Sequence, residues 1–316
     1  DMHLHVLAPD AQGPPPLGMC TPIAEMPAWD PGAGPYVDTI MAIFKKPSCK
    51  DPVWSPDTRE EMRARTLAEL EKHDVIGVLS GDSDKDIADW RKASPERIIP
   101  ALGDSIRMPV VDAATVARVK AMKASGDLVV LSEIGPQYMG MAPDDPRLEP
   151  FWALAEELDL PVGIHVGTGP PGTPYLAPPL KDYRARLHSA LVIEEVLARH
   201  PKLRVYLMHA GYPMIDDLLA VLYTHPQVYV DVGVIVYTQP RPAFYRYLQA
   251  IVEAGFAKRV MFGSDNMVWP ETIGRSIEVI QQAPFLSEAQ KRDIFYNNAA
   301  RFLRLDAATI ARHHAL

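Results

Sequence analysis

Long apolar runs and runs of basic residues are both missing from this sequence. No apolar stretch in the 316 residues reaches the roughly 18 to 20 residues that a membrane-spanning helix needs, so we expect no membrane span. Lysine and arginine number 32 against 40 acidic residues, and they form no cluster that would follow a phosphate backbone. These absences argue against nucleic acid as a partner and favour a small-molecule substrate, while self-association into a homo-oligomer is left open.

Nucleotide-binding motifs are also missing. No GxGxxG follows the first apolar segment, and the GTGPPG of residues 167–172 lacks the lysine of a P-loop. The composition, 47% hydrophobic and 23% charged, suits a chain with a large buried core. We therefore expect residues 1–316 to form a single globular domain.

Cysteine is scarce, since only Cys20 and Cys49 occur. Both lie in the proline- and glycine-rich segment 7–54, which shows little sign of regular structure, and a disulfide would restrain it. Two unrelated free thiols are the alternative. The chain begins with aspartate, as if a leading segment had been removed. We expect a Cys20–Cys49 disulfide in an exported protein, periplasmic or secreted, with a cytoplasmic protein as the alternative.

Short apolar segments alternate with longer amphipathic ones along the chain, a rhythm typical of β/α repeats. One amphipathic segment, residues 55–73, predicts a helix with Pro56 in its first turn. Eight apolar segments are predicted strands: 1–6, 74–80, 97–102, 128–133, 161–166, 203–209, 227–232 and 259–264. Eight such repeats predict an α/β fold, a (β/α)₈ TIM barrel, with residues 7–54 as a loop insertion after the first strand.

Polar residues stand at the ends of five of these apolar strands, where a barrel enzyme carries its catalytic groups. They are His3, His5, Glu133, His165, His209 and Asp265. An imidazole or carboxylate in such surroundings is costly to bury without a partner. Each has an ordinary structural explanation when taken singly, but imidazole and carboxylate together are the donors that zinc or manganese prefers. We therefore predict that these six residues are metal ligands.

The order of motifs DMHLHV, SEIG, GIHVGTG, LMHAG and FGSDN, followed by FYNNAARFLRL at 295–305, resembles the amidohydrolase superfamily, especially its amidohydrolase-2 branch. The resemblance implies that His3, His5 and Asp265 bind one metal and that His165 and His209 bind a second when it is present. The glutamate at position 133 is similar to the TatD-like pattern, in which it bridges two ions. Decarboxylases of the branch usually lack that glutamate, hold one ion and leave the strand-six histidine free.

These features favour a metal-dependent hydrolase of a small-molecule ester, lactone, amide or phosphoester, with two zinc ions and with manganese as an alternative. Metal-activated water would attack, and Asp265 would accept and return its proton. One alternative is a decarboxylase of an aromatic or unsaturated acid with a single ion, in which His209 handles the proton. Another is a barrel that binds metal without catalysis.

The walls of the substrate pocket are expected to come from the loops that follow the strands. Segment 7–54 is the best lid candidate. Several side chains near strand ends suit an aromatic substrate or its carboxylate: Tyr138, Tyr175, Tyr212, Tyr237, Trp269 and Arg184.

Overall fold

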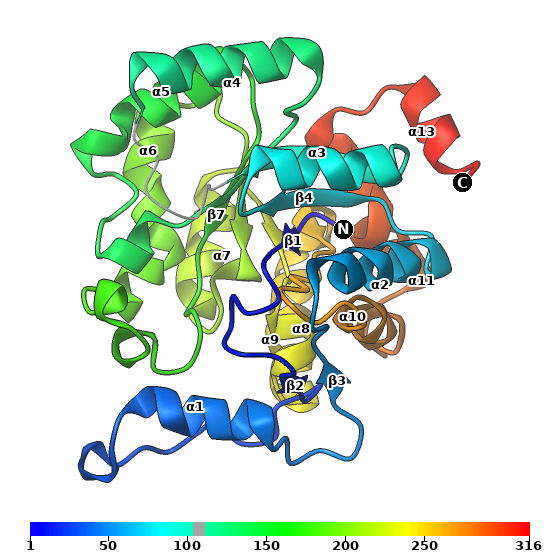
Figure 1. The fold of residues 1–316 in the computed structure, drawn as a ribbon. Helices are drawn as coiled ribbons and strands as arrows, with labels where there is room; N and C mark the ends of the chain where they lie inside the picture. The colour runs from blue at the N-terminus through cyan, green and yellow to red at the C-terminus, as the bar shows by residue number, and fades with distance from the viewer. Residues whose placement is uncertain (104–110) are drawn as a thin grey trace.

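Eight parallel strands surround the centre of the molecule in the computed structural model, which describes residues 1–103 and 111–316 (Figure 1). They are β1 (Leu4–Val6), β4 (Gly77–Gly81), β5 (Ile98–Gly103), β6 (Leu131–Ile134), β7 (Val162–His165), β8 (Val205–Met208), β9 (Tyr229–Asp231) and β10 (Val260–Met261). One sheet has the order β1-β4-β5 and the other β10-β9-β8-β7-β6.

Backbone contacts close these two sheets into one barrel. Ala101 in β5 forms a parallel bridge with Val130, just before β6. On the other side, the Met2 amide donates to the Phe262 carbonyl at 2.8 Å, which joins β1 to β10. All eight predicted strands occur, shifted by a few residues at most ends, and the predicted (β/α)₈ barrel is confirmed.

Helices cover the outside of the barrel (Figure 1). Those that alternate with the strands are α2 (Arg59–Lys72), α3 (Asp84–Ala93), α4 (Ala113–Ser125), α5 (Glu149–Glu157), α6 (Glu194–Arg199), α7 (Ile215–Thr224), α8 (Ile235–Thr238), α9 (Arg241–Ile251) and α10 (Thr272–Gln281). The chain ends with α11 (Glu288–Arg292), α12 (Asn298–Leu303) and α13 (Ala307–His313). Among the described residues, no helix has both the length and the apolar character needed to cross a membrane.

The first long helix, α2, begins later than its sequence pattern predicts. Thr58 is its N-cap, because the threonine hydroxyl accepts a hydrogen bond from the Glu61 amide. Pro56 therefore lies before the helix and not in its first turn, so the predicted start at residue 55 is wrong. Glu60 and Glu61 in the first turn and Lys72 in the last complement the helix dipole.

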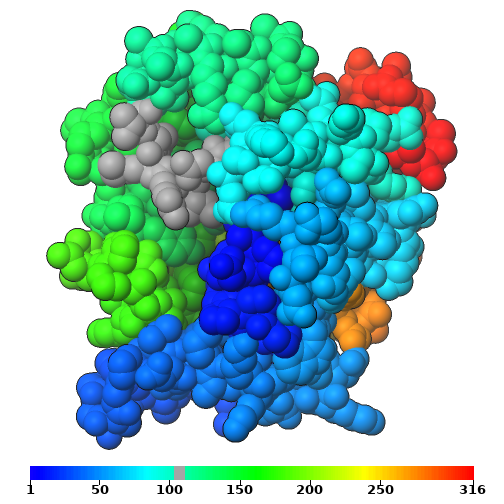
Figure 2. All heavy atoms as spheres, viewed as in Figure 1, coloured from blue at the N-terminus to red at the C-terminus, as the bar shows by residue number. Residues whose placement is uncertain are grey.

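The insertion after β1 contains more regular structure than its composition suggests. It forms α1 (Tyr36–Lys45) and a small antiparallel pair, β2 (Gly18–Met19) with β3 (Val53–Trp54). In Figure 1, α1 lies at the lower edge of the molecule, apart from the helices that surround the barrel. Figure 2 shows the first part of the insertion, in dark blue, between the rest of the insertion below and the body of the barrel above. The expectation of an irregular segment is therefore wrong.

A disulfide joins the two ends of this insertion. Cys20 and Cys49 are bonded, with their Cα atoms 5.8 Å apart and a sequence separation of 29. Cys20 follows β2 and Cys49 precedes β3, so the bond encloses α1. It stabilises the insertion by restricting the unfolded chain.

We expect alkylation of the unfolded, unreduced protein with iodoacetamide to label no cysteine, and alkylation after reduction to label two, as counted by intact mass. The double variant C20S/C49S should be destabilised by about 3 to 4 kcal/mol, the chain-entropy value for a loop of this length. Denaturant unfolding would measure the loss. Two labels before reduction would show that the disulfide does not form.

Candidate metal centre

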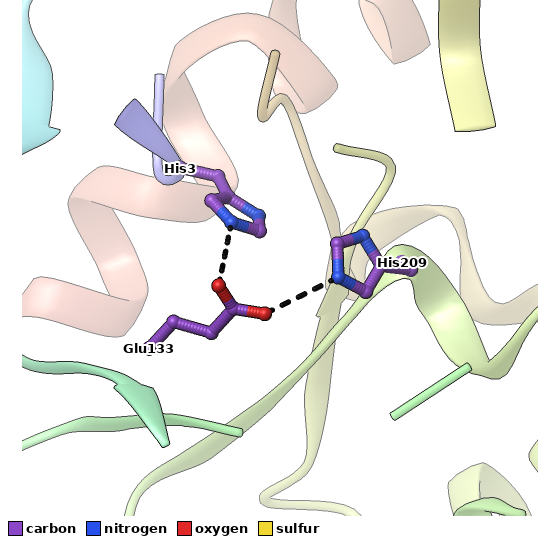
Figure 3. A group of neighbouring side chains, drawn as sticks. All are labelled: His3, Glu133 and His209. Atoms are coloured by element: carbon purple, nitrogen blue, oxygen red, sulfur yellow. Dashed lines mark hydrogen bonds and ion pairs between the residues drawn. The ribbon is translucent and has the colours of Figure 1, made fainter. Parts of the chain in front are cut away.

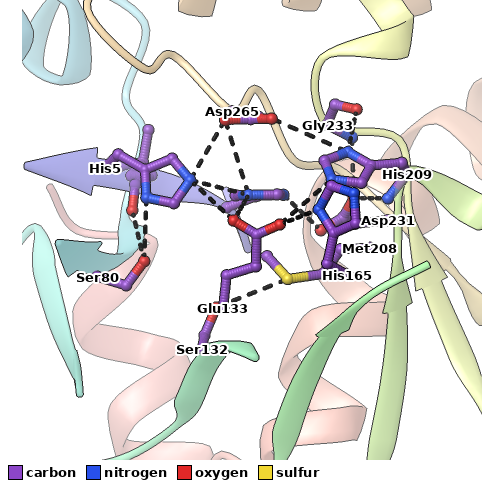
Figure 4. A network of polar contacts seen from close by, with 12 residues as sticks. His5, Ser80, Ser132, Glu133, His165, Met208, His209, Asp231, Gly233 and Asp265 are labelled. Carbon is purple, nitrogen blue, oxygen red and sulfur yellow. Dashed lines mark hydrogen bonds and ion pairs between the residues drawn. The ribbon is translucent and has the colours of Figure 1, made fainter. Parts of the chain in front are cut away.

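The structure brings together six polar side chains from five different strands (Figure 4). They lie within or close to β1, β6, β7, β8 and β10, with His3 just before β1, and are only 1 to 5% exposed: His3, His5, Glu133, His165, His209 and Asp265. They are the six residues that the sequence pattern predicts as ligands. The surrounding strands are largely apolar and buried, so these ionisable side chains lie against the hydrophobic core.

Glu133 lies between two groups of histidines, and its two oxygens face different groups. Oε2 is 3.4 Å from His5 Nε2 and 3.6 Å from His3 Nε2. Oε1 contacts His165 Nδ1 and is 3.4 Å from His209 Nε2. Figure 3 shows this carboxylate between His3 and His209. A carboxylate placed in this way has the arrangement of a bridging ligand.

Asp265 completes the side of the cluster formed by the two N-terminal histidines. Its Oδ1 is 3.3 Å from His5 Nε2 and 3.7 Å from His3 Nε2. That oxygen is buried and has no hydrogen-bond partner among the described residues. The Asp265 amide donates to the His3 carbonyl at 2.7 Å, which holds the carboxylate in register with the first strand.

Hydrogen bonds set the protonation of the outer nitrogens of His3 and His209. His3 Nδ1 is 3.1 Å from Asp231 Oδ2, and His209 Nδ1 is 2.9 Å from the Gly233 carbonyl oxygen. Both oxygens only accept, so in each ring Nδ1 carries the proton. The Nε2 atom of each ring then presents a lone pair to the cluster.

His5 has the same arrangement. Ser80 Oγ is oriented to donate to the Leu4 carbonyl at 3.4 Å, so it can accept from His5 Nδ1 at 3.2 Å. His5 Nε2 lies 3.1 Å from His3 Nε2, and both atoms face Asp265 Oδ1. A proton or a metal cation between the two nitrogens removes the repulsion of their lone pairs. This arrangement fits a metal ion.

His165 is less constrained than the other histidines. Its Nδ1 faces the cluster and lies 2.9 Å from His209 Nε2, while its buried Nε2 has no hydrogen-bond partner among the described residues. Gln137 donates from Nε2 to the His165 carbonyl at 2.7 Å and so fixes the backbone. The backbone of His165 is therefore positioned, and its ring contacts Glu133 through Nδ1.

The carboxylates of the cluster are anionic. Burial raises the pKa of Glu133, but the adjacent His165 opposes this effect, and the pKa lies well below its ordinary value. Burial likewise raises the pKa of Asp265, but His3 is the largest of several opposing partners, and the pKa is lowered. Carboxylate oxygens together with imidazole nitrogens are the donors that a divalent transition metal prefers.

Two sets of three residues have ligand atoms within 4.8 Å of one another: His3, Glu133 and His209, and His3, His5 and Asp265. A zinc or manganese ion suits either set, because both combine imidazole nitrogens with carboxylate oxygens. His165 belongs to neither set as the side chains stand, although it contacts Glu133.

Sequence reasoning missed Asp231, which the structure places directly behind the cluster. It is fully buried at the end of β9, in the sequence YVDV. The signal was present, because a carboxylate in an otherwise apolar strand needs a partner. Its partners are His3 and two backbone amides, and none of these can be found from sequence alone.

Two of the proposed substrate-binding residues are instead part of the core. Tyr237 is fully buried, and its hydroxyl donates to the Asp265 carbonyl at 2.9 Å. Trp269 is 1% exposed, and its indole donates to the Leu17 carbonyl at 2.9 Å, which anchors the insertion. The sequence predicts both in the pocket because they follow strand ends. In the structure, the polar atom of each side chain donates to a backbone carbonyl.

The other four proposed substrate residues differ in their surroundings. The Tyr138 ring lies beside His165, with centroids 4.7 Å apart. Tyr175 is 61% exposed, and the Tyr212 ring packs on another tyrosine. The Arg184 guanidinium donates to the Lys181 carbonyl at 2.9 Å on the surface. Only Tyr138 of these four has a ring contact with a member of the ligand cluster.

The chain is similar to one curated protein over part of its length. Gamma-resorcylate decarboxylase from Rhodococcus jostii (strain RHA1) is 29% identical over 192 residues, which span 52% of this chain and 56% of that relative. The matched region thus covers little more than half of the relative's length.

Two solved structures share the fold at low identity. A probable 2-pyrone-4,6-dicarboxylic acid hydrolase from Acinetobacter baumannii, with citric acid bound, is 15% identical with a TM-score of 0.56, covering 96% of this chain and 98% of that one. A 5-carboxyvanillate decarboxylase from Novosphingobium aromaticivorans, with manganese, is 15% identical with a TM-score of 0.56, covering 87% and 89%.

The family model described as amidohydrolase, that of the amidohydrolase-2 branch, matches residues 1–305. This match includes all five strand ends that carry the ligand cluster. The chain belongs to the amidohydrolase family.

Proposed function

We propose that the protein is a metal-dependent hydrolase that binds two divalent ions and cleaves an ester, lactone, amide or phosphoester of a small molecule. The observation that carries this proposal is the orientation of Glu133. One of its oxygens faces His3 and His5, and the other faces His165 and His209. A single ion would not need a carboxylate between two histidine pairs.

A divalent ion held by such donors lowers the pKa of a bound water toward about 7 and polarises an electrophilic centre. The chain itself supplies the proton acceptor. Asp265 Oδ1 is anionic and lacks a hydrogen-bond partner among the described residues, so it can take a proton from the attacking water. The same carboxyl group can then return the proton to the leaving group as general acid.

Non-oxidative decarboxylation of an aromatic or unsaturated acid, with one ion, is the second candidate. The relative from Rhodococcus jostii is a decarboxylase, which favours this reaction. Carbon dioxide would leave the ring and a proton would replace it at the same carbon. His209, with Nε2 directed into the site, is the residue placed to handle that proton.

Metal content tests the bridging role of Glu133. Elemental analysis of protein reconstituted with zinc or manganese should find about two ions per chain, and Glu133→Gln should hold about one, because the neutral amide is a poor bridge. Glu149→Gln is a matched control, since Glu149 also contacts a histidine, His200, but away from the site. One ion in the wild type, unchanged in Glu133→Gln, would argue for the single-ion reaction.

The proton-transfer role of Asp265 makes a separate prediction. Asp265→Asn should retain most of the metal but lower kcat at least about a hundredfold, because the amide cannot accept the proton. Asp159→Asn, which alters an arginine-paired carboxylate outside the ligand cluster, should leave kcat unchanged. Turnover near the wild-type rate in Asp265→Asn would exclude the role.

Product analysis separates the two reactions. The metal-loaded protein would be incubated with 2-pyrone-4,6-dicarboxylate and a panel of esters, lactones and phosphoesters, and separately with gamma-resorcylate and 5-carboxyvanillate. We expect acid release in the first set, followed by pH-stat titration, and no carbon dioxide in the second. Stoichiometric carbon dioxide without hydrolysis would replace the hydrolase proposal with the decarboxylase.

A further inference from the structure

Two residues at and just after the end of β9, Asp231 and Gly233, contact two candidate ligands that come from different parts of the chain. Asp231 Oδ2 lies 3.1 Å from His3 Nδ1, and the Gly233 carbonyl lies 2.9 Å from His209 Nδ1. Neither residue enters the ligand sets or the proton transfer described above. Both are visible behind the cluster in Figure 4.

The second oxygen of Asp231 is also fully used. Oδ1 accepts from the His209 amide at 3.0 Å and from the Gly233 amide at 2.9 Å. The carboxylate is completely buried, so no water competes for these bonds. One oxygen therefore binds two backbone donors, the other binds His3, and the carboxylate cannot rotate without breaking at least one of these contacts.

The packing leaves no room for an alternative arrangement. A Cβ atom on Gly233 would come within 2.6 Å of His3 Nδ1 and 3.0 Å of the Asp265 Cβ. The backbone of residues 231–233 thus approaches the first strand more closely than any side chain would allow. Because glycine has no Cβ, this segment comes close enough to supply both acceptors, Asp231 Oδ2 for His3 and the Gly233 carbonyl for His209.

We propose that Asp231 is a positioning residue that sets the tautomer of His3, and that it holds the Gly233 carbonyl where it sets the tautomer of His209. Both rings then keep Nδ1 in a hydrogen bond and direct Nε2 into the site. The inference rests on the proposed metal centre but concerns the state of the imidazoles, which is measurable without metal.

Asparagine at position 231 provides the sharpest test. Two backbone amides face one end of the side chain, so the amide oxygen must stay there and the NH₂ group must face His3. Two donors would then meet unless His3 moves its proton from Nδ1 to Nε2. With the proton on Nε2, His3 can no longer bind a metal through that atom.

Alanine at the same position removes the acceptor without adding a donor. His3 would then sample both tautomers, so Asp231→Ala should weaken zinc binding less than Asp231→Asn. A purely structural role predicts the opposite order, because alanine also deletes the two bonds to backbone amides. The ranking of the two variants therefore distinguishes positioning from stability.

The experiment is long-range ¹H–¹⁵N NMR of histidine-labelled protein, metal-free and zinc-loaded, with zinc affinity from chelator competition. In metal-free Asp231→Asn we expect the His3 signal to change from the Nδ1-H to the Nε2-H tautomer while His209 keeps its pattern. Zinc affinity should fall about 10- to 100-fold. Asp217→Asn, whose carboxylate accepts a hydrogen bond from the Ser189 hydroxyl, is the control.

An unchanged His3 tautomer in Asp231→Asn, or a changed tautomer with wild-type zinc affinity, would overturn the proposal. Stronger zinc binding in Asp231→Asn than in Asp231→Ala would also overturn it. Failure of the metal centre would look different, because the wild-type protein would then bind no zinc although its His3 and His209 signals still showed Nδ1-H.

Discussion

Closure of the barrel between its first and last strands is the constraint on which the site depends. The Asp265 amide donates to the His3 carbonyl at 2.7 Å, and through this bond residues that are far apart in sequence share one ligand set. The other ligands then meet them because parallel strands bring all their C-terminal ends to one face. The metal centre is therefore a consequence of strand register.

Two of the candidate ligands have backbone conformations that residues other than glycine rarely adopt. The φ angle is +61° at His209 and +54° at Asp265, both in the left-handed region. Such conformations cost of order 1 kcal/mol or more and persist only when neighbouring contacts hold them. Asp231 holds the amide of His209, and Tyr237 holds the carbonyl of Asp265. Residues behind the site thus stabilise the strained geometry of its ligands.

The sequence relative favours decarboxylation, whereas the position of Glu133 favours hydrolysis. The sequence relative is a decarboxylase, whereas the pyrone hydrolase shares the fold over nearly its whole length. A hydrolase and a decarboxylase both share this fold, so the fold does not choose between the two reactions. The distinguishing feature of this chain is the position of Glu133 between two pairs of histidines.

The sequence by itself determined the eight strands and the polar residues at their ends, because β/α periodicity and buried imidazoles or carboxylates are local patterns. The sequence pattern placed the start of α2 too early, at residue 55, because the helix begins after the Thr58 N-cap and not at Pro56. The pattern also gave no sign of α1. Only the tertiary structure decided which nitrogen of His3 carries the proton, and that Trp269 supports the insertion. Such contacts join residues more than 200 positions apart, and no local pattern encodes them.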